Sequence, residues 1–139
     1  MTPAETQTLL KSASAGATVH LVGAGGCGMS GLGHMLLDLG LSVTGSDRVH
    51  SPEAAALAAR GARILEGHDA AVVSETKPIL VVHTPAAAAD NPELQAARLA
   101  GIPILRRAEL LAAFARSQRV IAVAGMHGKT TTSGWLAYA

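Results

Sequence analysis

The sequence predicts an α/β protein with a Rossmann-like, doubly wound parallel sheet. Short apolar runs alternate with segments of helical spacing along most of the chain, which is the pattern of successive βαβ units. Glycine-rich segments follow the first and the last of these runs, where such folds turn from a strand into a helix. We therefore expect a parallel sheet with helices on both faces.

The first predicted strand is Thr18–Val22, which ends at the glycines of GAGGCGMSG. A helix follows, because apolar residues within 32–39 recur at i, i+3, i+4 and i+7 and Gly40 is placed to end it. Residues 41–45 then form the second predicted strand.

The next helix is predicted to begin at Ser51 and Pro52, an N-cap residue followed by proline in the first turn. Gly61 ends it. The remaining predicted elements are a strand at 62–65, a strand at 79–83, a helix at 91–100 between Asn91 and Gly101, a strand at 102–105, a helix at 107–115 and a strand at 120–124.

The composition fits one globular domain with an aliphatic core. Of the 139 residues 49% are hydrophobic and only three are aromatic, and the net charge is +1. Without a basic block, a nucleic-acid or membrane partner is not expected. A single cysteine, Cys27, excludes an internal disulfide. The N-terminus lacks the pattern of a signal peptide and no run reaches transmembrane length, so we predict a cytoplasmic protein.

The segment Gly23–Gly28 is a G-x-G-x-x-G motif between a predicted strand and a predicted helix. In this motif Gly23 permits the tight turn, Gly25 lets backbone N–H groups approach a diphosphate, and Gly28 lets the helix pack closely on the strand. The positive end of the helix adds to the attraction for anions. A tight turn without a ligand is the alternative.

Asp47 stands at the end of the second predicted strand. Its carboxylate can accept hydrogen bonds from a ribose hydroxyl or a base N–H, or it can be a solvated turn residue. Cys27 is expected to be a small buried side chain rather than a reactive thiol.

A second glycine loop, 125–130, reads GMHGKT and follows the strand predicted at 120–124. Its glycines are separated by two residues, whereas the usual phosphate loop has four. Lys129 is suited to the β- and γ-phosphates of a nucleotide, and the Thr130 hydroxyl to Mg²⁺. A strand-to-helix turn with an incidental lysine is the alternative.

The two loops, at this order and spacing, resemble the N-terminal part of the Mur ligases. The matching stretches run from about Val19 to Thr132 and are VHLVGAGGCGMSGLGHMLLDLG, VTGSD, EGHD, DNPELQAARLAGIPILRRAELLA and VIAVAGMHGKTTT. The family's shortened loop, G-T-[NH]-G-K-[ST]-[ST], matches except that Met126 replaces threonine. HTPAAAADNPEL also lacks the serine pair of many relatives.

The resemblance implies that the N-terminal domain holds a UDP-sugar. Asp47 would lie near the uridine, while His68 and Thr84 would be contacts at the rim of the site, with capping or turn roles as the alternative. The residues implied to wrap the diphosphate are Gly23, Gly25, Gly26, Cys27, Gly28, Met29 and Ser30.

The resemblance also implies a central domain that binds ATP and Mg²⁺. Lys129 and Thr130 would be its catalytic residues, with Thr130 on the metal. The implied ATP-binding residues are Gly125, His127, Gly128, Lys129, Thr130 and Thr131. The implied reaction belongs to peptidoglycan biosynthesis: ATP phosphorylates the carboxylate of UDP-N-acetylmuramate, and L-alanine attacks the acyl phosphate to form an amide.

On this reading residues 1–118 form a UDP-sugar-binding domain, and residues 119–139 begin a truncated ATP-binding domain. The isolated 139-residue chain is then expected to bind its UDP-sugar without catalysis. The strand at 120–124 would lack its neighbours, so we expect residues 119–139 either to self-associate with a second copy of the chain or to fold back on their own domain.

Three alternatives stay open. They are a murein-peptide-recycling ligase of the same family, an NAD-dependent or flavin-dependent oxidoreductase, and a stand-alone nucleotide-sugar sensor. His20, His34 and His50 are expected to be structural or surface histidines, because their spacing forms no metal site. The pair Arg106 and Arg107 is expected to be a solvated helix start.

Overall fold

The computed structural model describes residues 1–116 and confirms the predicted fold class. Five strands form one sheet in the order β3-β2-β1-β4-β5, and all neighbouring pairs are parallel. The strands are β1 (Thr18–Val22), β2 (Ser42–Asp47), β3 (Arg63–Glu66), β4 (Leu80–His83) and β5 (Ile104–Arg106). The strand predicted at 120–124 lies outside the described residues.

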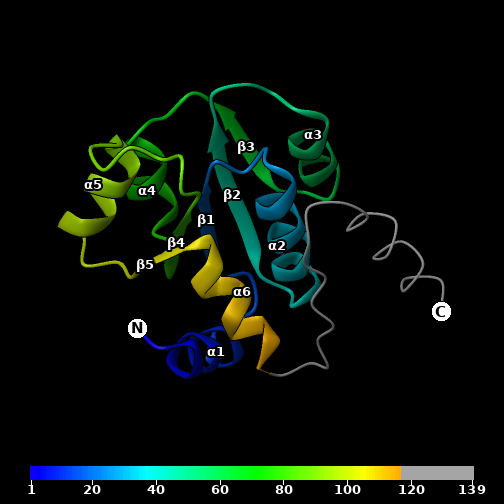
Figure 1. Ribbon diagram of the computed structural model, residues 1–139, viewed down its shortest axis with the longest axis vertical. Helices are drawn as coiled ribbons and strands as arrows, with labels where there is room; N and C mark the ends of the chain where they lie inside the picture. The colour runs from blue at the N-terminus through cyan, green and yellow to red at the C-terminus, as the bar shows by residue number, and fades with distance from the viewer. Residues whose placement is uncertain (117–139) are drawn as a thin grey trace, which may run out of the picture.

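Helices cover both faces of this sheet (Figure 1). One face carries α1 and α6 together with α2 and α3, and the other carries α4 and α5. The helices are α1 (Pro3–Ser12), α2 (Cys27–Asp38), α3 (Pro52–Ala59), α4 (Ala71–Thr76), α5 (Pro92–Leu99) and α6 (Arg107–Ala115).

The alternation of side chains along β1 divides the core between the two faces. Val19 and Leu21 are fully buried in the larger cluster, with the leucines of α2, α3 and α6. Val22 belongs to the smaller cluster beside α4 and α5. Since residues two apart in a strand share a face, His20 lies on the same side as Val22 and faces α5.

The predicted helix ends are confirmed by their caps. The Ser51 hydroxyl accepts a hydrogen bond from the Ala54 amide at 3.1 Å, and Asn91 Oδ1 accepts one from Glu93 N at 2.9 Å. Gly40 and Gly61 follow the ends of α2 and α3 with φ of +82° and +101°, a conformation that glycine adopts without strain.

Two helices were not predicted, and several strand ends differ by one or two residues. The start of α1 has a clear sequence signal for a helix. Thr2 Oγ1 accepts a hydrogen bond from Glu5 N at 3.1 Å, and Glu5 Oε2 accepts one from Thr2 N at 2.6 Å. This is a capping box, with Pro3 at the first helical position. The six-residue α4 is too short to show helical periodicity.

Candidate functional site

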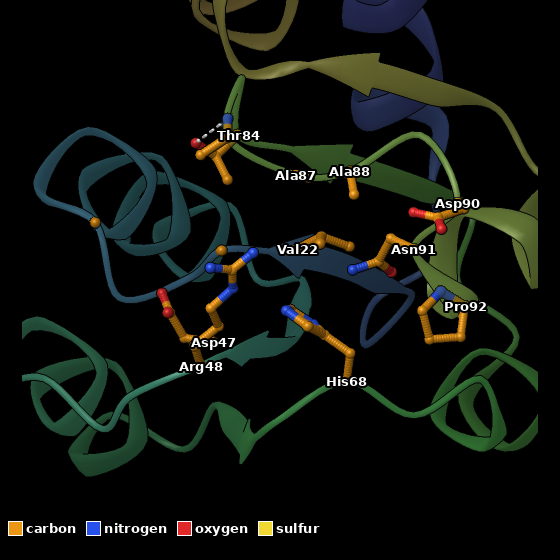
Figure 2. Close-up of a pocket in the computed structure, with 13 residues that line it drawn as sticks. Val22, Asp47, Arg48, His68, Thr84, Ala87, Ala88, Asp90, Asn91 and Pro92 are labelled. Carbon is orange, nitrogen blue, oxygen red and sulfur yellow. Dashed lines mark hydrogen bonds between the residues drawn. The ribbon is translucent and has the colours of Figure 1, made fainter.

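A pocket of about 500 Å³ opens at the carboxyl ends of the central strands (Figure 2). It lies where β1 pairs with β2 on one side and with β4 on the other. Ligands of doubly wound sheets bind at such a reversal of strand order. The pocket is lined by Val22, Gly23, Gly26, Asp47, Arg48, His68, Thr84, Ala86, Ala87, Ala88, Asp90, Asn91 and Pro92.

The turn after β1 requires glycine at its first position. Gly23 has a φ of +88°, and a Cβ built on it would lie 2.3 Å from Thr84 Cγ2. A larger residue would therefore be strained and would also collide with the end of β4. This contact sets the glycine loop directly against Thr84, and both residues line the pocket.

Gly25 is held between two side chains from neighbouring elements. Its N–H donates to Asp47 Oδ2 at 2.8 Å, and its carbonyl accepts from Ser51 Oγ at 2.9 Å. A Cβ on Gly25 would lie 2.7 Å from Ser51 Oγ and 2.8 Å from Asp47 Oδ2. We call these three residues the Gly25 clasp. In this structure the Gly25 amide binds the Asp47 carboxylate, an anion that the protein itself supplies.

Ser51 caps α3 and also donates to the Gly25 carbonyl, so its substitution tests both roles. Ser51→Ala is expected to lower the free energy of unfolding by about 1–2 kcal/mol, because a cap and a loop hydrogen bond are lost together. Ser42→Ala, at the exposed first position of β2, is the matched control. Urea denaturation measures both, and equal small effects would contradict the role given to Ser51.

Gly28 does not make the close approach to a strand that the motif predicts. Its added Cβ would lie 2.9 Å from Arg107 Nη1 on α6, not against a strand. The close approach of α2 to the sheet is instead at Gly33, where a Cβ would lie 2.9 Å from Leu57 Cδ2 and 3.1 Å from Leu21 Cδ1. The glycine that makes this contact is five residues after the last glycine of the motif.

The prediction that Cys27 is buried is wrong. Cys27 is exposed as the first residue of α2, with Sγ 3.6 Å from Glu53 Oε1. Met29 takes the interior position instead and is 1% exposed. The Ser30 hydroxyl donates to the Cys27 carbonyl at 3.0 Å. Neither Met29 nor Ser30 lines the pocket.

Other predicted site residues do meet at the pocket. Gly26, Asp47 and His68 line it together with Gly23 and Thr84. The predicted nucleotide-loop residues Gly125, His127, Gly128, Lys129, Thr130 and Thr131 lie outside the described residues.

Arg48 is a pocket residue that the sequence analysis missed. Its guanidinium extends into the pocket from the end of β2 (Figure 2), and within residues 1–116 it makes no ion pair. A guanidinium in this position favours an anionic ligand. The available signal was its place directly after Asp47, since the residue after a strand also lies at the carboxyl edge.

A buried carboxylate, Glu93, lies beneath the pocket and was also missed. Its Oε2 accepts from Ser46 Oγ at 2.6 Å and lies 3.1 Å from His68 Nδ1. Its Oε1 lies 3.3 Å from His20 Nε2, close enough for an ion pair but without hydrogen-bond alignment. His20 Nδ1 in turn lies 2.8 Å from Thr44 Oγ1. A histidine inside an apolar strand needs a buried polar partner. His20 within TVHLV was therefore the signal in the sequence that a group such as Glu93 lies nearby.

The charge of Glu93 is stabilised by these neighbours. Burial alone would raise its pKa, because the charged form loses water. The contacts with His20, Ser46 and His68 more than offset burial, and the pKa of Glu93 lies below its ordinary value. We call Glu93, Ser46, His68, His20 and Thr44 the Glu93 network.

Residues 1–116 contain neither a metal-binding cluster nor a membrane-spanning helix. Within this range no group of three His, Cys, Asp or Glu side chains is arranged to hold a metal ion. None of the helices there has the length and apolarity of a transmembrane span.

Comparison with known proteins identifies the family. The sequence profile of the Mur ligase family, catalytic domain, matches residues 18–119. A UDP-N-acetylmuramate–L-alanine ligase of Laribacter hongkongensis is 50% identical over 121 residues, which cover 87% of this chain and 25% of that protein.

Two solved structures share the fold closely. A UDP-N-acetylmuramate-alanine ligase from Thermotoga maritima superposes with a TM-score of 0.80 at 35% identity, covering 87% of this chain and 28% of that one. A murein peptide ligase from Psychrobacter arcticus superposes with a TM-score of 0.80 at 34% sequence identity. The match covers 88% of this chain and 26% of that one. The chain spans about a quarter of the length of the curated relatives it matches. With most of its length matched by one family profile, the chain belongs to the Mur ligase family.

Proposed function

We propose that this chain is the UDP-N-acetylmuramate-binding part of an ATP-dependent ligase that joins L-alanine to that UDP-sugar in peptidoglycan biosynthesis. The observation that most supports this proposal is the pocket where the strand order reverses. The glycine loop, Asp47, Arg48 and His68 lie together in its lining. Its volume of about 500 Å³ is within the usual range for small-molecule sites.

The chemistry of the lining supports a nucleoside diphosphate as the ligand. The first turn of α2 follows the glycine loop, so its free N–H groups favour phosphate oxygens. Arg48 adds a fixed positive charge at the same edge. Asp47, His68 and Asn91 supply polar groups for the hydroxyls and base of a nucleoside.

The proposal divides the chain into two parts. Residues 1–118 bind the UDP-sugar, and residues 119–139 contribute to ATP binding, with Lys129 on the phosphates and Thr130 on Mg²⁺. These ATP contacts rest on the loop sequence GMHGKT alone. A cytoplasmic location, which the single Cys27 favours, and self-association through residues 119–139 belong to the same proposal.

L-Alanine is preferred over a peptide as the second substrate because of the curated relatives. Proteins named UDP-N-acetylmuramate–L-alanine ligase match at 46–50% identity. The solved structures do not separate the two kinds of ligase, because they match at 35% and 34% identity with the same TM-score.

A thermal-shift titration tests the UDP-sugar site. UDP-N-acetylmuramate is expected to raise the melting temperature of the 139-residue chain, because a ligand at about a hundred times its Kd stabilises the native state by about 2.7 kcal/mol. NADH is the control for the oxidoreductase alternative and is expected to give no shift. A flat curve up to millimolar UDP-sugar, or a shift with NADH alone, would overturn the proposal.

A further inference from the structure

The Glu93 network lies between the core and the pocket, and one of its members reaches the ligand side. His68 is the outermost member, with a side chain 24% exposed, whereas Glu93 and His20 are fully buried. Figure 2 shows the His68 imidazole directed into the pocket between Arg48 and Asn91. The Nδ1 edge of the ring is held by the network, which leaves Nε2 for the pocket.

The positions of the protons around His68 Nδ1 follow from its neighbours. The 2.6 Å contact between Ser46 Oγ and Glu93 Oε2 uses the serine proton, since an ionised carboxylate can only accept. Nδ1 lies 3.0 Å from the same serine oxygen and 3.1 Å from the same carboxylate oxygen. Both neighbours therefore offer lone pairs, so Nδ1 must carry the proton. In the neutral ring Nε2 is then a bare acceptor.

His20 faces the other oxygen of Glu93, which favours the opposite tautomer. Its Nε2 lies 3.3 Å from Oε1 without hydrogen-bond alignment, and the facing carboxylate favours a proton on this nitrogen. Its Nδ1, 2.8 Å from Thr44 Oγ1, can then accept the threonine proton. One carboxylate thus faces two histidines, one in the core and one in the pocket wall, and hydrogen-bonds to the second.

We propose that Glu93 is a positioning residue that holds His68 as the Nδ1–H tautomer, so that His68 Nε2 accepts a hydrogen bond from a donor group of the bound nucleoside. The inference rests on the proposed function for the identity of the nucleoside. In uridine the available donors are the imide N–H of the base and the ribose hydroxyls. A phosphate oxygen, which carries no proton to donate, is not the partner of neutral His68.

The first measurement needs no ligand. Long-range ¹H–¹⁵N spectra of the histidine side chains at about pH 8, where histidine is ordinarily neutral, are expected to show His68 protonated at Nδ1. An unconstrained histidine prefers a proton on Nε2, so the two results are distinct. Assignment uses His68→Gln. Observation of His68 protonated at Nε2 would overturn the proposal whether or not any UDP-sugar binds.

Two variants show whether Glu93 itself fixes the His68 tautomer or whether any change in the Glu93 network alters it. Glu93→Met removes the acceptor at similar side-chain size and frees the Ser46 proton, so His68 is expected to change to the Nε2–H tautomer. Ser46→Ala disturbs the same network but leaves the carboxylate, so His68 is expected to stay protonated at Nδ1. A change of tautomer in Ser46→Ala, or none in folded Glu93→Met, would contradict the assignment to Glu93.

UDP and two analogues then test the ligand side by calorimetry. Glu93→Met is expected to weaken UDP about tenfold, the value of one well-formed hydrogen bond, whereas Glu66→Met, exposed at the end of β3, leaves the affinity within about twofold. 3-Methyl-UDP lacks the imide donor and 2′-deoxy-UDP lacks one hydroxyl. The analogue that has lost the partner of His68 is expected to bind more weakly than UDP and to lose no further affinity in Glu93→Met.

The outcomes are distinguishable. If Glu93→Met weakens UDP and both analogues equally, neither the imide nor the 2′-hydroxyl is the partner. If it also weakens 3′-deoxy-UDP by the same factor, no donor of the nucleoside is left as the partner and the ligand half of the proposal is wrong. If UDP fails to bind the unmutated chain, the proposed function fails, and the tautomer measurement alone decides the role of Glu93.

Discussion

Gly25→Val is expected to abolish the thermal shift produced by UDP-N-acetylmuramate and to lower the free energy of unfolding by about 2–4 kcal/mol. A branched side chain at this position occupies the space of Ser51 Oγ and Asp47 Oδ2, each less than 3 Å from the added Cβ. The clasp must open, which breaks one charge-assisted and one neutral hydrogen bond and displaces the loop that borders the pocket.

Gly31→Val is the matched control. Gly31 lies on α2, and a Cβ there meets nothing within 4 Å, so stability is expected to change by less than about 0.5 kcal/mol and the ligand shift to remain. Thermal melts of both variants, with and without ligand, give the comparison. A normal ligand shift in Gly25→Val would show that the clasp is dispensable for binding.

Glu93→Ala is expected to destabilise the fold by about 3 kcal/mol or more at pH 7. Removing one partner of a buried charged network leaves the others without compensation, which typically costs about 3–5 kcal/mol. Here His20 Nε2 would lose the carboxylate that it faces, and Ser46 would lose its acceptor. Glu66→Ala, at an exposed glutamate, is the control. A loss below about 1 kcal/mol in urea denaturation would contradict the account.

The loss of stability caused by Glu93→Ala is expected to depend on pH. The pKa of Glu93 is lowered from 4.5, so its ionised form is favoured by folding. Its contribution is fully present above the unfolded-state value and is lost as the pH falls through the lower folded-state value. The stability difference between unmutated protein and Glu93→Ala should therefore shrink below about pH 4.5. His20 and His68 are the titratable side chains that face Glu93.

Most strands and helices could be predicted from sequence because local chemistry decides them. The N-cap at Ser51, the N-cap at Asn91 and the glycines after α2 and α3 all act within a few residues, and the apolar runs match the buried strands. The start of α1 was equally readable from Thr2 and Glu5. This helix was not predicted because the residues after Glu5 show no strong helical repeat of apolar side chains.

The interior of the site could not be predicted in the same way. Glu93 is at the second position of α5, where a glutamate normally faces solvent, and only the packing of α5 against β1 buries it. Likewise, Gly25 follows the dinucleotide-binding pattern, but its contacts come from Asp47 and Ser51, more than twenty residues away. These roles depend on which elements become neighbours, which neither spacing nor propensity specifies.

The central position of β1 also has a consequence for how the chain folds as it leaves the ribosome. The ladder between β1 and β2 can form once Asp47 has been made, but the second ladder waits for β4, which ends at His83. At ordinary rates of synthesis the intervening stretch takes about 2–7 s, far longer than elementary folding steps. During that interval one edge of β1 is unpaired, with His20 still without Glu93 from α5. We expect nascent chains halted before residue 80 to be recognised by chaperones, and those extended past α5 to be released.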